Sequence, residues 1–506
     1  MKRLLQFIRS HLNSIVPLVF FAVGLVGILH HELWRDEFQA YLIAQRSHSI
    51  AELLFNSRFE GHPRLWFFLL YILTRFTQAP FAMQVVHLGL ATIGIVLFVR
   101  FSPFTKVQKI LGSFGYYTLY EYGVISRNYV LSVLFAFLFC TLFPTRKKTY
   151  LWVGLALFLL TQTSVEGLIL TFALTVLLFF EPIISLDMRK VLPWKRWITI
   201  IPILLVMAGA LLSVWQLVPQ YATGIGEGWS FRWDSEYIVR TIATITRSYM
   251  PIPRLSMQFW NSNILGSWGL EAGVSIIFLT IGFLVFAGSP PLLITYLVGT
   301  GSLLAFFYFR WFGFSRHHGY LFLLFLVLAW LQFLEKGRDF HFRFFGRGFA
   351  ITSLFRKNIL TLVFLLQFIG AIAALGFDFV YPFSESKQTA EYIQAHNLNN
   401  MVIVADYDYA GTPVAGYLDR DVYFPQRSSM GSFVFWDYSR HYLDYREVLA
   451  KANTLATKRG EDVLILLNYP MTNLQNLPYQ IEFLASFTRS VVPDEVYFLF
   501  RMRQGK

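Results

Sequence analysis

The segment SIVPLVFFAVGLVGILHHELWRDE, residues 14–37, joins an apolar run to a strongly charged one. Residues 14–31 are apolar enough for a membrane-spanning helix. Four of the eight residues 30–37 are Arg, Asp or Glu, whereas only 14% of the chain is charged. Ionisable groups packed against the mouth of a membrane bundle are costly, so we expect this loop to carry function.

The composition indicates a polytopic α-helical membrane protein. The chain has 506 residues, of which 55% are hydrophobic and 53 are Phe, more apolar surface than a soluble domain of this size can bury. Its single cysteine, Cys140, excludes an intrachain disulfide and a CxxC metal site.

The net charge of +13 does not indicate nucleic-acid binding, because Lys and Arg cluster in short segments between apolar runs. These segments are 2–9, 100–109, 145–148, 184–196 and 335–357, the pattern of cytoplasmic loops. The first apolar run ends in His-His-Glu without a small-residue cleavage site, so we interpret it as a retained anchor.

Hydropathy predicts about 11 membrane-spanning helices, several of them shorter than the roughly 20 residues that a bilayer needs. They are expected near 14–31, 82–100, 110–123, 127–144, 149–163, 165–183, 197–217, 270–287, 290–309, 318–334 and 358–377. Residues 64–77 are interpreted as a juxtamembrane helix on the outer face, because a crossing there would place the basic segment 100–109 outside. The N-terminus is then cytoplasmic, and the loops 32–63 and 218–269 lie outside with the C-terminus.

The predicted organisation is a transmembrane domain over residues 1–380 and a small extracytoplasmic α/β domain over 381–506. β-rich runs occur at 401–406, 421–424, 462–467 and 496–500, with helical patterns near 385–397 and 439–458. About 125 residues are enough for such a domain to fold alone.

Asp36 and Glu37 are the first candidates for catalysis. Neighbouring side chains on a helix diverge by about 100°, so one carboxylate can face a cleft while the other pairs or caps. A carboxylate within reach of a hydroxyl can act as a general base. The structural alternative is that both simply favour a helix N-terminus, whose dipole attracts negative charge.

Other ionisable groups are expected at the same outer end of the bundle. Arg127 and Tyr129 open an apolar helix, and Arg127 is expected to bind a phosphate or to pair with Glu121 or Asp36. Arg310 with Arg316, His317 and His318 flanks two further helix ends, where an arginine suits a phosphate. For both groups, interfacial anchoring is the structural alternative. His62 and Arg64 at a helix entrance, with Glu121 and Glu166, are candidates for an acceptor or cleft. Adjacent histidines rarely bind one metal ion with good geometry, so the sequence leaves the metal requirement unknown.

Several known signals are absent from the sequence. It has no Walker A loop, no Gly-rich dinucleotide fingerprint, no HExxH and no GxSxG motif. We also find no inverted repeat of the kind that many transporters carry. ATP-driven transport and serine hydrolysis are therefore disfavoured.

Taken together, Trp34-Arg35-Asp36-Glu37 after the first helix, His62-Pro63 before the next apolar helix and Ser126-Arg127-Asn128-Tyr129 at a helix start resemble the GT-C-type membrane glycosyltransferases. The resemblance is to the bacterial branch similar to protein O-mannosyltransferases, the aminoarabinose transferase of lipid A and the Rgt-type lipopolysaccharide sugar transferases. It covers roughly residues 14–180. The family often has Pro-Pro after the histidine, where this chain has Pro63-Arg64.

The resemblance implies a glycosyltransferase that moves a hexose or pentose from a polyprenyl-phosphate sugar to an extracytoplasmic glycan, lipid or protein. It implies a bacterial inner (plasma) membrane location, with Asp36 as general base and Glu37 as its neighbour or alternate. Arg127 and the Arg310–Arg316 region would stabilise the phosphate leaving group. No cofactor is implied with certainty, and a divalent metal is left open.

Three alternatives stay open on the sequence. A lipid-linked glycan transporter or flippase would need a path through the bundle and would keep some transport without Asp36. A non-catalytic membrane assembly protein would act through residues 381–506. A different lipid-phosphate enzyme would use the same anion-binding residues.

Overall fold

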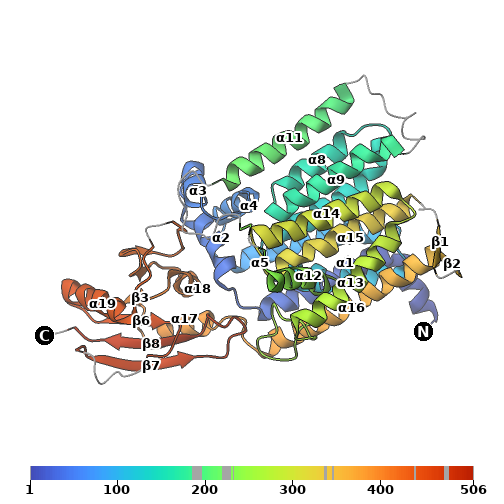
Figure 1. Ribbon diagram of the computed structural model, residues 1–506. Helices are drawn as coiled ribbons and strands as arrows, with labels where there is room; N and C mark the ends of the chain where they lie inside the picture. Colours follow the sequence, from blue (N-terminus) through green and yellow to red (C-terminus); the bar gives the residue numbers. More distant parts are fainter. Residues whose placement is uncertain are drawn as a thin grey trace.

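The computed structural model shows a bundle of long helices with a small sheet-containing domain at one end (Figure 1). It describes residues 2–184, 197–218, 230–231, 233–335, 339–344, 347–437, 440–471 and 478–504. Parts of the predicted basic segments 184–196 and 335–357 and of the predicted loop 218–269 lie outside these residues.

Nine helices in the described residues are long and apolar enough to cross a membrane, which confirms a polytopic helical membrane protein. They are α1 (Lys2–His30), α5 (Phe81–Phe101), α7 (Tyr129–Leu142, continued by the 3-10 turn η2, Phe143–Lys147), α9 (Val165–Ile184), α11 (Trp197–Leu217), α13 (Trp268–Phe286), α14 (Pro290–Phe309), α15 (Ser315–Leu334) and α16 (Ser353–Val380). Helix α15 is buried almost along its whole length and forms the centre of the bundle.

The predicted span 110–123 is not one continuous helix. The chain forms α6 (Lys106–Ser113) and then η1 (Tyr116–Val124), a wider π-helix. The Thr118 hydroxyl donates to the Gly112 carbonyl at 2.6 Å and accepts from the Gly115 N–H at 3.1 Å, so it competes with the backbone bonds that would continue an α-helix. π-helical turns are frequent at functional sites.

Two shorter apolar helices lie among the long ones. Helix α8 (Leu151–Thr161) replaces the predicted span 149–163, and α4 (Leu65–Thr74) occupies the predicted juxtamembrane segment. Helix α4 packs against α2.

The long connections carry structure that the sequence did not predict. The first one contains α2 (Arg35–Arg46) and α3 (Ile50–Asn56), and the connection before α13 contains α12 (Ser235–Tyr249). The basic stretch before α16 contains an antiparallel pair, β1 (Phe340–Phe344) and β2 (Arg347–Ile351).

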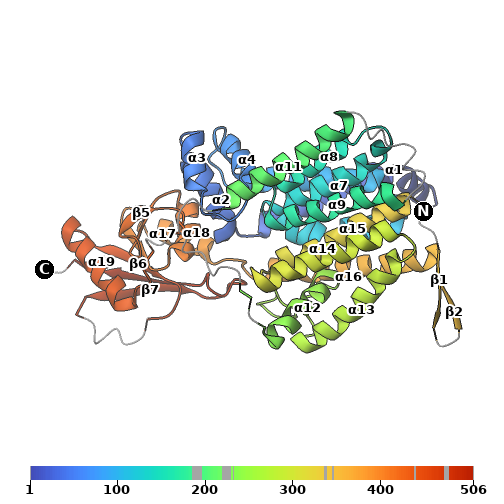
Figure 2. The same ribbon diagram turned by 45° about the horizontal axis from the view of Figure 1, so that its top comes forward.

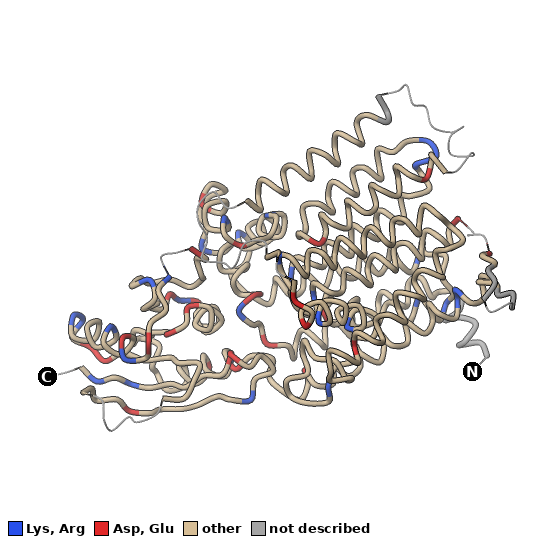
Figure 3. The backbone as a smooth tube through the Cα atoms, in the orientation of Figure 1, with Lys and Arg blue, Asp and Glu red and all other residues tan. Residues whose placement is uncertain are grey.

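Charged residues gather toward the two ends of the bundle, and the middle of the long helices carries few of them (Figure 3). At the end away from the C-terminal domain, Arg146 is fully buried and pairs with Glu181 at 2.5 Å and with Glu335 at 3.0 Å. At the other end, side chains from α2, the start of α7 and the start of α15 converge.

The C-terminal domain is an α/β sandwich around a six-stranded mixed sheet with strand order β5-β4-β3-β6-β8-β7. Its strands are β3 (Val402–Ala405), β4 (Val422–Phe424), β5 (Ser429–Gly431), β6 (Val463–Leu467), β7 (Ile481–Phe487) and β8 (Tyr497–Met502), and its helices are α17 (Ser386–Ala395), α18 (Asp408–Leu418) and α19 (Tyr445–Arg459). One core contains residues of α17 and α18 and the other contains residues of α19, so helices cover both faces. Helix α18 and strands β5 and β7 were not predicted from the sequence.

The C-terminal domain docks on helix α2, which lies between it and the bundle in both views (Figures 1 and 2). Gly416 of α18 faces Phe38 of α2 so closely that a Cβ there would lie 2.2 Å from the ring. The next residue, Tyr417, accepts a 2.8 Å hydrogen bond from the Leu33 backbone N–H. The domain therefore holds in place the segment that carries Asp36.

We expect the substitution Gly416→Ala to loosen this docking, because the added methyl group must displace a fully buried ring. Overpacking of this kind costs about 1–3 kcal/mol. The measurement is the thermal unfolding midpoint together with the rate of proteolysis near residue 380. Gly376→Ala on α16, where a Cβ meets nothing within 4 Å, is the matched control and should be neutral or stabilising by up to about 1 kcal/mol. Equal midpoints for both variants would contradict this account of the docking.

Candidate functional site

The centre of the site is the carboxylate of Asp36 in the first turn of α2. Arg127 Nη1 and Arg316 Nη2 each lie 3.0 Å from Asp36 Oδ2. Arg127 also donates to the Asp36 backbone carbonyl at 2.7 Å. The Asp36 side chain is 25% exposed, and the side chains of Arg127 and Arg316 are 12% and 9% exposed. The ion cluster is therefore mostly buried, and solvent reaches it at the Asp36 carboxylate.

The two arginines come from rigid parts of the bundle. Arg127 lies in the turn between η1 and α7, and its carbonyl accepts a 3.1 Å hydrogen bond from His87. Arg316 lies in the first turn of α15, and its carbonyl accepts a 2.6 Å hydrogen bond from Tyr122 of η1. These hydrogen bonds hold the backbone of each arginine through contacts that do not involve Asp36.

Aromatic rings surround the Arg316 guanidinium. Its central carbon lies 5.4 Å from the ring centre of Trp34, 5.6 Å from that of Trp260 and 4.8 Å from that of Phe314. Cation–π contacts of this kind stabilise a desolvated cation. They stabilise the Arg316 guanidinium at this position.

The electrostatic balance keeps Asp36 ionised. Burial disfavours the charged form, but the guanidinium groups of Arg127 and Arg316, with Arg35 beside them, outweigh burial and lower the pKa of Asp36. Asp36 is therefore a carboxylate at neutral pH. Its proton affinity depends on how strongly the two arginines are engaged with it.

Glu37 points away from Asp36 into the protein and is fully buried. It accepts hydrogen bonds from the Ser126 backbone N–H at 2.6 Å, from His31 at 3.1 Å and from the Trp34 N–H at 3.3 Å. The other nitrogen of His31 lies 2.9 Å from Asp378 at the end of α16. Burial opposes the charge of His31, but the carboxylates of Asp378 and Glu37 outweigh it and raise the pKa of His31 well above its usual value. Glu37 is thus placed as an anchor that joins α2 to α1, α7 and α16.

Three further predicted residues meet beside the ion cluster. The Nδ1 atom of His317 accepts from the Phe314 N–H at 2.8 Å, so its Nε2 carries the proton and donates to the Tyr129 hydroxyl at 3.0 Å. The His62 ring stands edge-on to the Tyr129 ring at 5.9 Å. Burial and the charges of Arg127 and Arg316 lower the pKa of His62 to about 3, so its imidazole is neutral.

His318 does not join this group. Because adjacent helical residues point about 100° apart, its ring turns toward Phe307 and Phe312, and its Nε2 donates to the Phe312 carbonyl at 2.9 Å. The described residues contain no cluster of three or more His, Cys, Asp and Glu that could hold a metal ion.

Four predicted residues remain, namely Glu121, Arg64, Glu166 and Arg310. Glu121 is buried in η1 and accepts from the Tyr116 hydroxyl at 2.8 Å and from Trp260 Nε1 at 3.1 Å. Trp260 thus contacts both Glu121, by this hydrogen bond, and Arg316, by its ring. The other three lie at helix ends. Arg64 directly precedes α4, with its guanidinium 5.7 Å from the Trp215 ring centre. Glu166 is buried in the first turn of α9, and Arg310 directly follows α14.

Several residues of the site were missed from the sequence. His31 and Asp378 form one chain with Glu37 although they are 347 positions apart. Trp260 comes from a loop with no recognisable motif. Glu60 lies in the quoted Glu60-Gly61-His62-Pro63 turn, and its side chain accepts a 2.7 Å hydrogen bond from Gln39 of α2.

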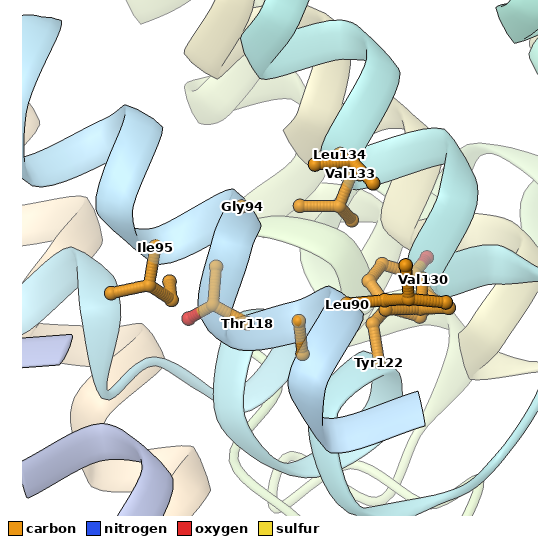
Figure 4. A pocket seen from close by; sticks show the side chains of 9 residues that line it. Leu90, Gly94, Ile95, Thr118, Tyr122, Val130, Val133 and Leu134 are labelled. Atoms are coloured by element: carbon orange, nitrogen blue, oxygen red, sulfur yellow. The ribbon is translucent and has the colours of Figure 1, made fainter. Parts of the chain in front are cut away.

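A cavity between α5, η1 and α7 carries no such chemistry (Figure 4). It has about 10 Å³ of internal space, at the lower limit for one water molecule, and almost entirely apolar walls. Gly94, Thr118 and Val133 are among its lining residues. It is a gap in the packing of the bundle rather than a binding site.

Comparisons with protein-family models, with curated proteins and with solved structures found no match. An ionised carboxylate, two arginines and a neutral histidine lie together at the end of a membrane bundle. Such a set can hold an anion and accept a proton from a neighbouring hydroxyl.

Glu60 makes the stability of this region sensitive to pH. Burial raises the pKa of Glu60 to about 7, against the Gln39 hydrogen bond and the charge of Arg127. Because the folded-state pKa is above the usual 4.5, the stabilisation from Glu60 is complete below 4.5 and is lost as the pH rises through about 7.

We expect the thermal unfolding midpoint of the wild type to fall more between mildly acidic and mildly alkaline pH than that of Glu60→Gln, which keeps an acceptor for Gln39. Glu461→Gln, at an exposed position, should follow the wild type. Parallel curves for the wild type and Glu60→Gln would contradict the raised pKa.

Proposed function

We propose that the protein is a membrane glycosyltransferase of the GT-C type that uses a polyprenyl-phosphate sugar as donor. The observation that carries the proposal is the Asp36 carboxylate held at 3.0 Å by Arg127 and by Arg316 at one end of a membrane bundle. A lipid-phosphate donor needs a cationic site at that level of the membrane. The acceptor needs a base within reach of the same site.

The same two arginines serve the carboxylate and the donor in turn. The donor phosphate competes with Asp36 for the guanidinium N–H groups of Arg127 and Arg316, which bind phosphate and carboxylate with the same fork geometry. When the phosphate takes these donors, the charge that lowers the pKa of Asp36 is neutralised. The carboxylate then becomes a stronger base at the moment when the donor is in place.

In the transfer step, the acceptor hydroxyl oxygen attacks the anomeric carbon of the sugar. The bond from that carbon to the phosphate oxygen breaks, and its electrons leave with polyprenyl phosphate, whose charge Arg127 and Arg316 stabilise. The hydroxyl proton passes to Asp36. Attack opposite the leaving group inverts the anomeric configuration. The neutral His62 and the Tyr129–His317 pair border the space in which the sugar would lie.

We place the Asp36 end of the bundle on the extracytoplasmic side of a bacterial plasma membrane, with the N-terminus cytoplasmic. Support comes from the basic residues at the opposite end, which follow the positive-inside rule. They include Arg100, Lys106, Lys147, Lys148 and Lys357. The C-terminal domain then lies outside, where a glycan, lipid or protein acceptor arrives.

The test is sugar transfer from synthetic polyprenyl-phosphate sugars by purified full-length protein. We expect Asp36→Asn to lose about 10²–10⁴-fold in turnover, the range for removal of a general base, while the protein stays folded. Asp462→Asn is the matched control, because that carboxylate pairs with Arg501 within the C-terminal sheet, and it should transfer at the wild-type rate.

The alternative functions give different results in the same assay. Equal turnover by Asp36→Asn and the wild type would remove Asp36 from the mechanism. Transport of a lipid-linked glycan by both proteins, without transfer, would favour a flippase. Absence of both activities, with cell-envelope assembly still dependent on residues 381–506, would favour an assembly protein.

A further inference from the structure

In the parallel part of the C-terminal sheet, the order in which the chain adds strands reverses between β3 and β6, although the two strands are parallel. From β3 the chain passes through α18 to β4 on one side, and it returns through α19 to β6 on the other side of β3. In open α/β sheets, ligands bind outside the carboxyl ends of the strands at such a reversal. The chemistry of that edge therefore indicates whether the domain binds a ligand.

Each of the three parallel strands is followed there by a buried oxygen that lacks a hydrogen-bond donor among the described residues. These atoms are Asp406 Oδ1 directly after β3, Asn468 Oδ1 directly after β6 and Gln426 Oε1 just past β4. Asp406 is 1% exposed and Gln426 is 2% exposed. A buried acceptor without a donor is costly, so three of them along one edge point to a ligand that brings donors of its own.

Aromatic rings stand at the same edge. The Tyr407 ring centre lies 5.3 Å from that of Tyr409, 6.2 Å from that of Tyr469 and 6.5 Å from that of Tyr442. Tyr442 is 78% exposed, so the cluster continues to the surface. Rings of this kind stack on the C–H faces of a sugar ring. The Tyr469 hydroxyl donates to Asp406 Oδ2 and so holds that carboxylate at the edge.

The charges at this edge favour a neutral ligand. The buried carboxylate of Asp408 is matched by Arg440, whose two nitrogens donate at 2.7 and 2.6 Å. The free oxygens of Asp406, Asn468 and Gln426 are acceptors, which repel a phosphate. Asp406 Oδ2 already accepts a hydrogen bond from the Tyr469 hydroxyl. With Asp408 matched by Arg440, the one remaining carboxylate oxygen of Asp406 is a poor site for a divalent cation.

We propose that this edge binds the sugar units of a hydroxyl-rich glycan, which is the acceptor of the transfer reaction. The hydroxyl groups of a glycan supply the donors that the three oxygens lack, and the tyrosines supply the stacking surface. The acceptor role rests on the proposed function, whereas the binding of a glycan does not.

The edge is connected to the transfer site through Arg35. Its guanidinium lies 5.0 Å from the Tyr409 ring centre and forms an ion pair with Asp494, while its backbone N–H donates to Glu495 at 3.1 Å. Arg35 immediately precedes Asp36. A glycan bound at the sheet edge would therefore present its end toward the proposed base.

The experiment is a calorimetric titration of the full-length protein with short oligosaccharides derived from maltose, cellulose, chitin, mannan and galactan. We expect at least one series to bind, and Tyr407→Ala to weaken that binding by about tenfold or more. Phe483→Ala, an exposed aromatic residue on the far edge strand β7, is the matched control and should bind as the wild type does. Thermal unfolding shows that each variant is folded, and Tyr442→Ala is a second test at an exposed position.

The outcomes separate this inference from the proposed function. Asp36→Asn should keep full oligosaccharide binding while transfer is lost. Transfer to a non-sugar acceptor, with no oligosaccharide bound by the wild type, would overturn the inference and leave the proposed function standing. Oligosaccharide binding without transfer from any donor would overturn the proposed function alone. Binding of Ca²⁺ or inorganic phosphate that is lost in Asp406→Asn, with no oligosaccharide bound, would also overturn the inference.

Discussion

At the end of the apolar bundle, the Asp36 carboxylate forms ion pairs with two arginines, Arg127 and Arg316. Arg127, Arg316 and Asp36 come from three separate segments, so their ion pairs join the turn before α7, the start of α15 and α2. The fold and the site are thus assembled by the same contacts.

The adjacent carboxylates have divided roles because a helix points them in different directions. Glu37 faces inward, where Ser126 and His31 use its oxygens, and His31 extends the chain to Asp378. This series of buried contacts holds α2 against the helix bundle. The C-terminal domain fixes it from the other side through Gly416 and its neighbours. Asp36, on the remaining face, is the carboxylate that stays open to solvent.

The sequence predicted the features that follow from hydropathy and charge. Apolar length indicated the long helices, and costly charges at their ends indicated that Asp36, Arg127 and Arg316 would lie on one side. It failed where local side chains decide the backbone, as with Thr118 and the π-helix, and where a proline inside α18 hid a helix. It also could not pair His31 with Asp378, because their contact depends on how α1 and α16 pack. The split between Asp36 and Glu37 required the orientation of α2, which the sequence left open.

We propose that Asp36 and the donor phosphate compete for the same two arginines. The most direct test is the affinity of the purified protein for polyprenyl phosphate, measured for the wild type and for Asp36→Asn. We expect tighter binding by Asp36→Asn, because its amide engages Arg127 and Arg316 less strongly and leaves them to the phosphate. Equal or weaker binding by this folded variant would contradict the competition between Asp36 and the phosphate.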